Sequence, residues 1–256
     1  MKRYIYLILR KIFVFLIPAK SENNFQIKHI GSFYGGYDIV VKNKIAHIIS
    51  CGLGEDATFD IEAINKFNCK VIAVDPTPRA KNHYEQICSK SGVPKTLDYL
   101  ENSGKQKIDS YDLKKINKDN FILIYKAITD KNNSKIKLYF PKNENFVSSS
   151  VEIDKNYSND YFVAETINIK TILQNHKIEH IDILKLDIEG GEFEVLNDII
   201  KNKIYPDQLL VEFKNIKSVN FFKLFKIFWI NKKLLKKGYQ IVFINKKGDY
   251  TYLKIN

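Results

Sequence analysis

The chain has 256 residues, of which 45% are hydrophobic and 27% are charged, a composition that excludes disordered, collagen-like and low-complexity proteins. Its formal net charge is +12, yet only three basic residues are arginines, which argues against a surface specialised for nucleic acid. The three cysteines, Cys51, Cys69 and Cys88, form no C-x-x-C pair, so we expect no disulfide framework or structural zinc site and a reducing, cytoplasmic setting.

The first segment, residues 1–17, is apolar but is interrupted by Arg10 and Lys11. A membrane-spanning helix needs roughly 20 apolar residues, and a signal peptide needs an unbroken apolar centre, so neither is predicted. The charges fall on one side of a predicted helix, which fits a helix lying in a membrane interface or a helix packed on the domain. We expect an N-terminal unit at residues 1–44, an amphipathic helix and the segment that follows it, and a domain at residues 45–256.

From residue 45 onward, strand-like and helix-like segments alternate. This alternation predicts an α/β fold with a doubly wound, mostly parallel sheet and an antiparallel strand near the C-terminus. The predicted strands are residues 45–51, 70–74, 121–128, 136–140, 181–186, 208–213, 239–245 and 250–255, and the predicted helices are residues 55–67, 78–89, 171–177, 192–200 and 221–237.

The loop after the first predicted strand reads Cys51-Gly52-Leu53-Gly54-Glu55-Asp56. In a parallel sheet, ligands bind beyond the carboxyl ends of the strands, and glycine lets the backbone approach a ligand closely. The third glycine of the dinucleotide fingerprint is absent, and two acids at the expected helix start would disfavour a pyrophosphate. A ligand that carries an amine and a sulfonium fits this acidic loop better.

Asp75 and Pro76 follow the second predicted strand, and Asp75 lies 21 positions after Gly54. A carboxylate at this place can accept hydrogen bonds from both ribose hydroxyls, although a turn or helix-capping aspartate is the alternative. The order strand, Gly-x-Gly, helix, strand, Asp predicts an adenosine site. Because no phosphate-binding signal accompanies it, the pattern points to S-adenosylmethionine.

Three further acids lie at or just after the ends of predicted strands, on the same edge of the predicted sheet. Asp187 and Glu189 follow the strand at residues 181–186, and they face the cleft or cap the helix that starts near Gly191. Glu212 ends its own strand and is either a third acid in reach or an ordinary exposed charge.

The remaining candidate groups carry weaker signals. His47 is expected inside a strand, and His83 is expected on a solvated helix. Residues 148–150 are serines in a long polar loop, residues 141–160, which is either a lid over the cleft or a plain solvated loop.

Four motifs resemble those of the FkbM-type methyltransferases in order and spacing, over roughly residues 45–255. They begin at Cys51 (Cys-Gly-Leu-Gly-Glu-Asp), Val74 (Val-Asp-Pro-Thr-Pro), Ile183 (Ile-Leu-Lys-Leu-Asp-Ile-Glu-Gly-Gly-Glu-Phe-Glu-Val-Leu) and Leu209 (Leu-Leu-Val-Glu-Phe). The resemblance implies a class I Rossmann-like methyltransferase domain at residues 45–256 that uses S-adenosylmethionine. Many members carry Asp-x-Gly-x-Asn-x-Gly in the first loop, from which this chain departs.

From position and resemblance together, we assign two groups of candidate residues and no metal ligand. Cofactor binding is assigned to Cys51, Gly52, Gly54, Glu55, Asp75 and Pro76, and acceptor orientation or deprotonation to Asp187, Glu189 and Glu212.

The expected reaction is O-methylation of a hydroxyl on a sugar, a glycan or another small acceptor. The alternatives are an RNA methyltransferase, supported only by the net charge, and a non-catalytic protein that kept the cofactor fold. The Asn/Asp-Pro-Pro-Tyr/Phe sequence of base methylation is absent. Peripheral contact with the inner face of a membrane through residues 1–17 is a further hypothesis.

Overall fold

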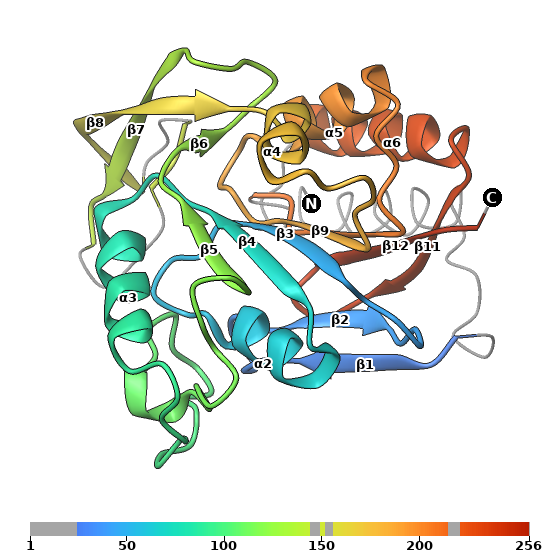
Figure 1. The fold of residues 1–256 in the computed structure, drawn as a ribbon. Helices are drawn as coiled ribbons and strands as arrows, with labels where there is room; N and C mark the ends of the chain where they lie inside the picture. The colour runs from blue at the N-terminus through green and yellow to red at the C-terminus, as the bar shows by residue number, and fades with distance from the viewer. Residues whose placement is uncertain (1–24, 144–148, 152–155, 215–220, 256) are drawn as a thin grey trace.

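The structure is a computed structural model that describes residues 25–143, 149–151, 156–214 and 221–255 (Figure 1). The helix expected at residues 1–17 therefore lies outside the described residues. Within the described part of the chain, no helix is long and apolar enough to cross a membrane.

A seven-stranded sheet forms the centre of the molecule. β12 pairs antiparallel with both of its neighbours, whereas β10, β9, β3, β4 and β5 run parallel to one another, which confirms the predicted α/β sheet. In spatial order the strands are β11 (Tyr239–Ile244), β12 (Tyr250–Lys254), β10 (Gln208–Val211), β9 (Ile183–Leu186), β3 (His47–Cys51), β4 (Lys70–Val74) and β5 (Phe121–Ile124).

Helices cover both faces of this sheet, as Figure 1 shows. The central strands are almost continuously apolar because they are buried on both sides. One face packs against α4 (Ile169–His176), α5 (Glu192–Lys201) and α6 (Phe221–Leu235), and the other packs against α2 (Thr58–Phe67) and α3 (Pro78–Ser89).

Two of the helix starts test the sequence analysis directly. α3 begins at Pro78, as predicted, and its N-cap is Thr77, whose hydroxyl accepts a hydrogen bond from the Ala80 amide. α2 begins at Thr58 rather than at position 55. The two acids before it remain in the loop, because the Glu55 carbonyl accepts from the Gln106 amide and Asp56 accepts from the Thr58 amide.

An N-terminal hairpin precedes the sheet and was not predicted as strands. β1 (Ile27–Ile30) pairs antiparallel with β2 (Tyr37–Val40), and Gln208 of β10 holds the hairpin in place. The Gln208 side chain accepts from the Val40 amide at 2.8 Å and donates to the Val40 carbonyl at 2.9 Å. The buried Gln208 side chain thus satisfies both backbone groups of Val40 and links the hairpin to the central sheet.

A second, three-stranded sheet lies beyond β5. The predicted strand at residues 121–128 divides into β5 and β6 (Ala127–Ile128), and β6 joins β8 (Tyr157–Ile167) and β7 (Lys135–Pro141). The prediction of a loop up to residue 160 was wrong for its last part, because β8 begins at Tyr157. β8 was missed because its exposed face mixes polar residues with the exposed Tyr161 and Val163, and because its pairing with β7 decides its conformation.

Candidate functional site

A cavity of about 270 Å³ opens at the carboxyl ends of β3, β4, β9 and β10. This is the edge of the sheet where a parallel α/β fold places its ligands. Its polar lining includes seven carboxylates and two ammonium groups, supplied by Glu55, Asp56, Asp75, Asp187, Glu189, Glu194, Glu212, Lys185 and Lys247.

The two-glycine loop forms one wall of the cavity. Gly52 has φ +89° and Gly54 has φ +58°, a backbone region that residues with side chains seldom adopt. A Cβ added to Gly52 would lie 1.8 Å from the carbonyl oxygen of Asp187, so this glycine lets the ends of β3 and β9 approach each other. The buried Lys185 ammonium donates a hydrogen bond to the Gly52 carbonyl and ties the same two strands together.

Asp75 lies under this loop and is buried. Its Oδ2 accepts hydrogen bonds from the amides of Leu53 and Gly54, both at 2.9 Å. Its Oδ1 accepts from the Thr77 amide at 2.8 Å and from the Thr77 hydroxyl at 2.6 Å. A carboxylate has about four acceptor positions, so all of them are engaged, and Asp75 holds the loop in shape.

Three further acids, Asp187, Glu189 and Glu212, line the neighbouring part of the cavity, which we call the acidic wall. The Tyr37 hydroxyl donates to Oδ2 of Asp187 at 3.0 Å. The negative charge of Asp187, followed by burial, raises the pKa of Glu212 to about 9, so Glu212 carries a proton at neutral pH. Glu189 adopts φ +56°, and its carbonyl accepts from the buried Ser150 hydroxyl.

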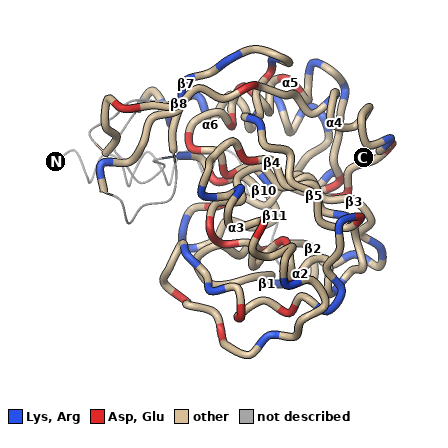
Figure 2. The backbone as a smooth tube through the Cα atoms, turned by 60° about the vertical axis from the view of Figure 1, so that its left-hand side comes forward, with Lys and Arg blue, Asp and Glu red and all other residues tan. Residues whose placement is uncertain are grey.

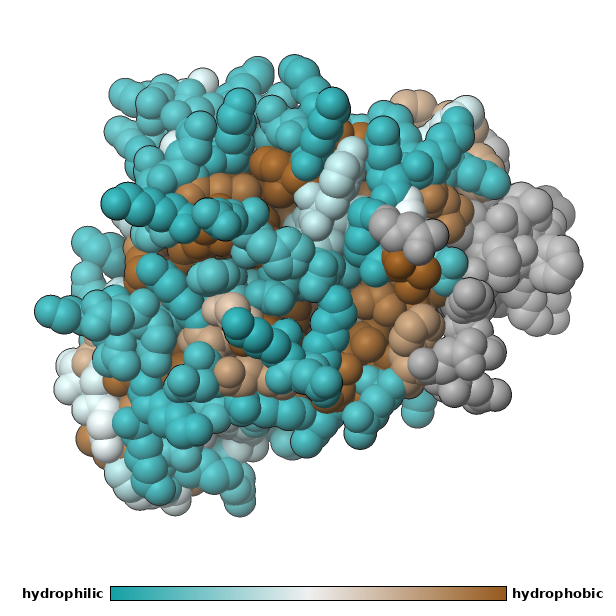
Figure 3. All heavy atoms as spheres, turned by 45° about the vertical axis from the view of Figure 1, so that its right-hand side comes forward, coloured by the Kyte–Doolittle hydropathy of each residue, from teal (hydrophilic) through white to brown (hydrophobic). Residues whose placement is uncertain are grey.

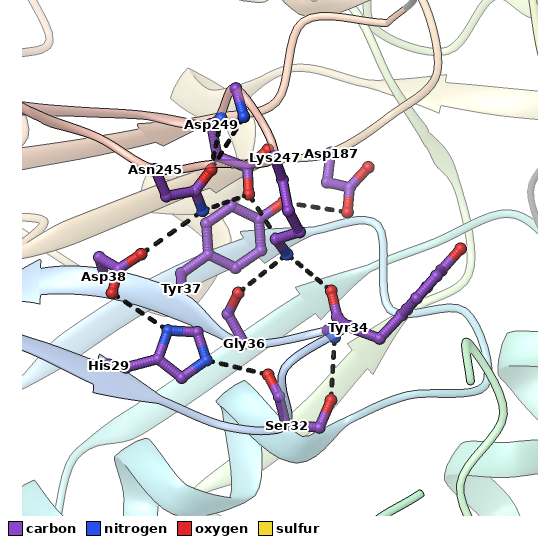
Figure 4. Close-up of polar contacts among 12 residues, drawn as sticks. His29, Ser32, Tyr34, Gly36, Tyr37, Asp38, Asp187, Asn245, Lys247 and Asp249 are labelled. Atoms are coloured by element: carbon purple, nitrogen blue, oxygen red, sulfur yellow. Dashed lines mark hydrogen bonds and ion pairs between the residues drawn. The ribbon is translucent and has the colours of Figure 1, made fainter. Parts of the chain in front are cut away.

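The roof of the cavity is held by polar contacts between the N-terminal hairpin and the β11–β12 turn (Figure 4). The Lys247 ammonium donates to the carbonyls of Tyr34 at 2.7 Å and Gly36 at 3.4 Å and pairs with Asp249 at 3.3 Å. Asn245 connects Asp249 to the hairpin through Asp38. Lys247 and Tyr34 both line the cavity, so these contacts position its wall.

Comparison with known proteins identifies the family of this chain. The family model described as Methyltransferase FkbM domain matches residues 42–241. The chain belongs to the FkbM methyltransferase family. No curated protein and no solved structure gave a significant match.

The FkbM fold brings most of the sequence-predicted residues to one cavity. Eight of them line it, namely Gly52, Gly54, Glu55, Asp75, Pro76, Asp187, Glu189 and Glu212. Cys51 is not among the described residues that line it; its side chain packs in the core, and burial raises the pKa of its thiol to about 12. Its backbone still contributes, because the Cys51 carbonyl accepts from the Asp187 amide.

Several site residues of this FkbM protein were missed by sequence reasoning. Tyr34, Tyr37 and Lys247 lie outside residues 42–241, and no local motif marks them. Lys185 was read only as part of an apolar strand. A lysine inside an otherwise apolar strand was the one signal available, since a buried ammonium requires a partner.

Glu192 begins α5 and is bonded to the loop that carries Glu189. Its Oε1 accepts from the Gly190 amide at 2.8 Å, so this side chain, rather than Asp187 or Glu189, accepts the hydrogen bond from the loop amide. Burial raises the pKa of Glu192 to about 7.

The expectation for His83 was wrong, whereas His47 lies in a strand as expected. His83 is buried, and its Nε2 lies 2.8 Å from the Tyr111 hydroxyl. Burial lowers the pKa of His83 to about 4, so the ring that meets this hydroxyl is neutral at pH 7. The Tyr111 oxygen accepts in turn from the Ala57 amide, at the N-cap of α2.

The serine segment lies partly beside the cavity. Residue 148 is outside the described residues, Ser149 lines the cavity, and Ser150 is buried with its hydroxyl in contact with Lys214 and the Glu189 carbonyl. Ser150 therefore belongs to the packed wall behind Glu189 rather than to a solvated loop.

One group of potential metal ligands lies at the other end of the sheet. Ligand atoms of His180, Asp182 and Asp207 all lie within 4.8 Å of one another. Asp182 already accepts from the amides of Ala46 and His47, and Asp207 pairs with Lys42 at 2.7 Å and with His180 at 3.0 Å. These protein partners account for the cluster without an ion.

Proposed function

We propose that this FkbM protein transfers the methyl group of S-adenosylmethionine to a hydroxyl of a sugar, a glycan or another small acceptor. One observation carries the proposal: the two-glycine loop with Asp75 and the acids Asp187, Glu189 and Glu212 line the same cavity. A donor held by the loop would therefore present its methyl group to an acceptor held beside the acids.

The charge of the cavity fits such a donor. S-adenosylmethionine carries an ammonium and a sulfonium, and carboxylates outnumber ammonium groups in the polar lining. Glu55 and Asp56 lie beside the loop and would face the ammonium. Because the four acceptor positions of Asp75 are engaged, a ribose would reach Asp75 only by displacing the Thr77 hydroxyl, the one donor of the four that can rotate away.

The acceptor would lie toward the acidic wall. Methyl transfer to oxygen is an in-line displacement that needs positioning, exclusion of water and removal of the hydroxyl proton. Glu212 holds a proton at neutral pH, so Asp187 and Glu189 are the candidates to accept the hydroxyl proton. Ile136, Leu138 and Val151 line the cavity with apolar atoms and would exclude water.

The distribution of charge disfavours an RNA substrate. Figure 2 shows lysine and arginine spread over many parts of the described chain, interspersed with aspartate and glutamate. The cavity itself is rich in carboxylates, which would repel a phosphate backbone. A protein that only binds the cofactor would need no acids beside the loop.

Calorimetry with S-adenosylhomocysteine, followed by a methyl-transfer assay on a panel of sugars and their amino-sugar analogues, tests the proposal. We expect binding of the cofactor product and methylation of hydroxyls. Glu55→Gln should weaken binding roughly tenfold, as for one charged hydrogen bond, whereas Glu85→Gln on the exposed face of α3 should not. No binding would contradict the cofactor assignment, and methylation confined to amines would contradict the acceptor assignment.

A further inference from the structure

Helix α6 has a buried side and an aromatic side. Leu224, Ile227, Ile230 and Leu234 are buried, and three of them join the core that covers one face of the central sheet. Phe222, Phe225 and Trp229 are 66%, 45% and 52% exposed, respectively. Residues three and four apart share one side of a helix, so these three rings form one stripe, which we call the α6 aromatic stripe.

The rings of this stripe contact one another and lysines. The ring centres of Phe225 and Trp229 lie 5.9 Å apart with an interplanar angle of 73°, and those of Phe228 and Trp229 lie 6.1 Å apart. The Lys226 ammonium lies 5.4 Å from the Phe222 ring, and the Lys232 ammonium lies 5.5 Å from the Phe228 ring. Large aromatic side chains and ammonium groups therefore meet at one surface.

The charged residues of α6 and of the segments on either side of it are all lysines. The sequence contains no Asp or Glu between Glu212 and Asp249. In that interval it carries lysines at 214, 217, 223, 226, 232, 233, 236, 237, 246 and 247. Figure 3 shows one face of the molecule, on which hydrophobic side chains form several patches between hydrophilic ones. Single exposed apolar residues need no explanation, but three aromatic residues on consecutive turns of one basic helix do.

We propose that the α6 aromatic stripe docks on the surface of an anionic lipid bilayer. Phenylalanine and tryptophan rings insert at the boundary between headgroups and acyl chains, and lysines around them pair with anionic headgroups. The buried side of α6 anchors the helix to the domain, so only its exposed side is available for this contact. Charge complementarity with an anionic surface selects a bilayer over an apolar groove of another protein.

The test uses Trp229, which is the single tryptophan of the chain. The full-length protein is titrated with vesicles of phosphatidylcholine alone and of phosphatidylcholine with phosphatidylglycerol. We expect a blue shift of the tryptophan emission, and quenching by brominated acyl chains, only with the anionic vesicles. Raising the salt concentration should weaken the binding, because lysines contribute through a screened attraction.

Variants separate this surface from others. Phe222→Ser with Phe225→Ser keeps the Trp229 reporter and should weaken binding to the anionic vesicles at least tenfold. Lys226→Gln with Lys236→Gln should also weaken this binding and should reduce its dependence on salt concentration. The matched control is Phe140→Ser with Val163→Ser, which changes residues 39% and 54% exposed on β7 and β8 and should leave binding within twofold. Circular dichroism confirms that each variant is folded.

Four results would overturn the proposal. Vesicle sedimentation without a change in Trp229 emission would place the membrane contact elsewhere, for instance at residues 1–17. Emission that is already blue-shifted and shielded from acrylamide at low protein concentration would show that the chain covers its own stripe. A blue shift that grows with protein concentration would indicate a second copy. Equal binding of vesicles and of a single-stranded RNA would indicate a non-specific basic surface.

Discussion

The Tyr37 hydroxyl donates a hydrogen bond of 3.0 Å to Oδ2 of Asp187, although the two residues are 150 positions apart. Burial and the charge of Asp187 raise the pKa of Tyr37 well above its usual value, so the hydroxyl stays protonated and can donate this hydrogen bond. The ammonium groups of Lys185 and Lys247 lie 5.3 Å and 5.5 Å from the centre of the Tyr37 ring. The N-terminal hairpin thus reaches into the acidic wall of the site.

Tyr37→Phe should lower turnover while leaving cofactor affinity nearly unchanged. The change removes the donor to Asp187 and keeps the buried ring, and a hydrogen bond to a charged group contributes about 1.5–3 kcal/mol, or roughly 10- to 100-fold in rate. Steady-state kinetics and calorimetry with S-adenosylhomocysteine measure the two effects. Tyr239→Phe is the control, since that buried hydroxyl donates to the Pro206 carbonyl. Equal loss of turnover in both variants would refute the positioning role.

Gly52→Ala should destabilise the protein far more than Gly92→Ala. Both glycines have φ near +90°, so each substitution carries a backbone cost of about 1–2 kcal/mol. Only at Gly52 does the added Cβ meet an obstacle, the Asp187 carbonyl at 1.8 Å, whereas nothing lies within 4 Å at Gly92. Urea unfolding of the two variants provides the comparison. A similar loss in both would mean that β3 and β9 are not in close contact there.

The raised pKa of Glu212 predicts that stability falls as pH rises from about 4.5 to about 9. The folded protein holds this proton up to about pH 9, whereas a free glutamate releases it near 4.5, so the free energy of unfolding falls as pH rises between these values. Glu212→Gln should flatten this decline, and Glu85→Gln should not. Denaturant titrations from pH 5 to 9 measure the slope. Identical slopes in the wild type and Glu212→Gln would show that Glu212 is ionised in the folded state.

His83 predicts an opposite dependence at acid pH. Its pKa falls from 6.5 to about 4 on folding, so its contribution to stability is present above pH 6.5 and is lost as pH falls toward 4. His83→Gln cannot titrate and should lose less stability over this interval, while the two curves should run parallel above pH 7.5. Thermal unfolding between pH 4 and 8 tests this. Parallel curves throughout would show that His83 is not buried in the neutral form.

Much of the fold could be predicted because its signals are local. The apolar runs of β3, β4, β9 and β10, the Thr77 cap of α3 and the alternation of strands with helices identify the sheet and its helices. β1, β2 and β8 could not be found in this way. Their side chains alternate weakly between exposed and buried, and their strand conformation depends on partners elsewhere in the chain.

The candidate site, like the fold, could be predicted from the sequence only in part. The sequence alone determined which loops end parallel strands and therefore that Gly52, Gly54, Asp75, Asp187 and Glu212 meet at one edge, because chain order and parallel pairing dictate that edge. Only the tertiary structure decided that Tyr37 bonds to Asp187, that amides and a hydroxyl occupy every acceptor position of Asp75, and that Glu212 stays protonated. Hydrogen bonds and pKa values depend on distances and burial between residues far apart in the chain, and these exist only once the chain has packed.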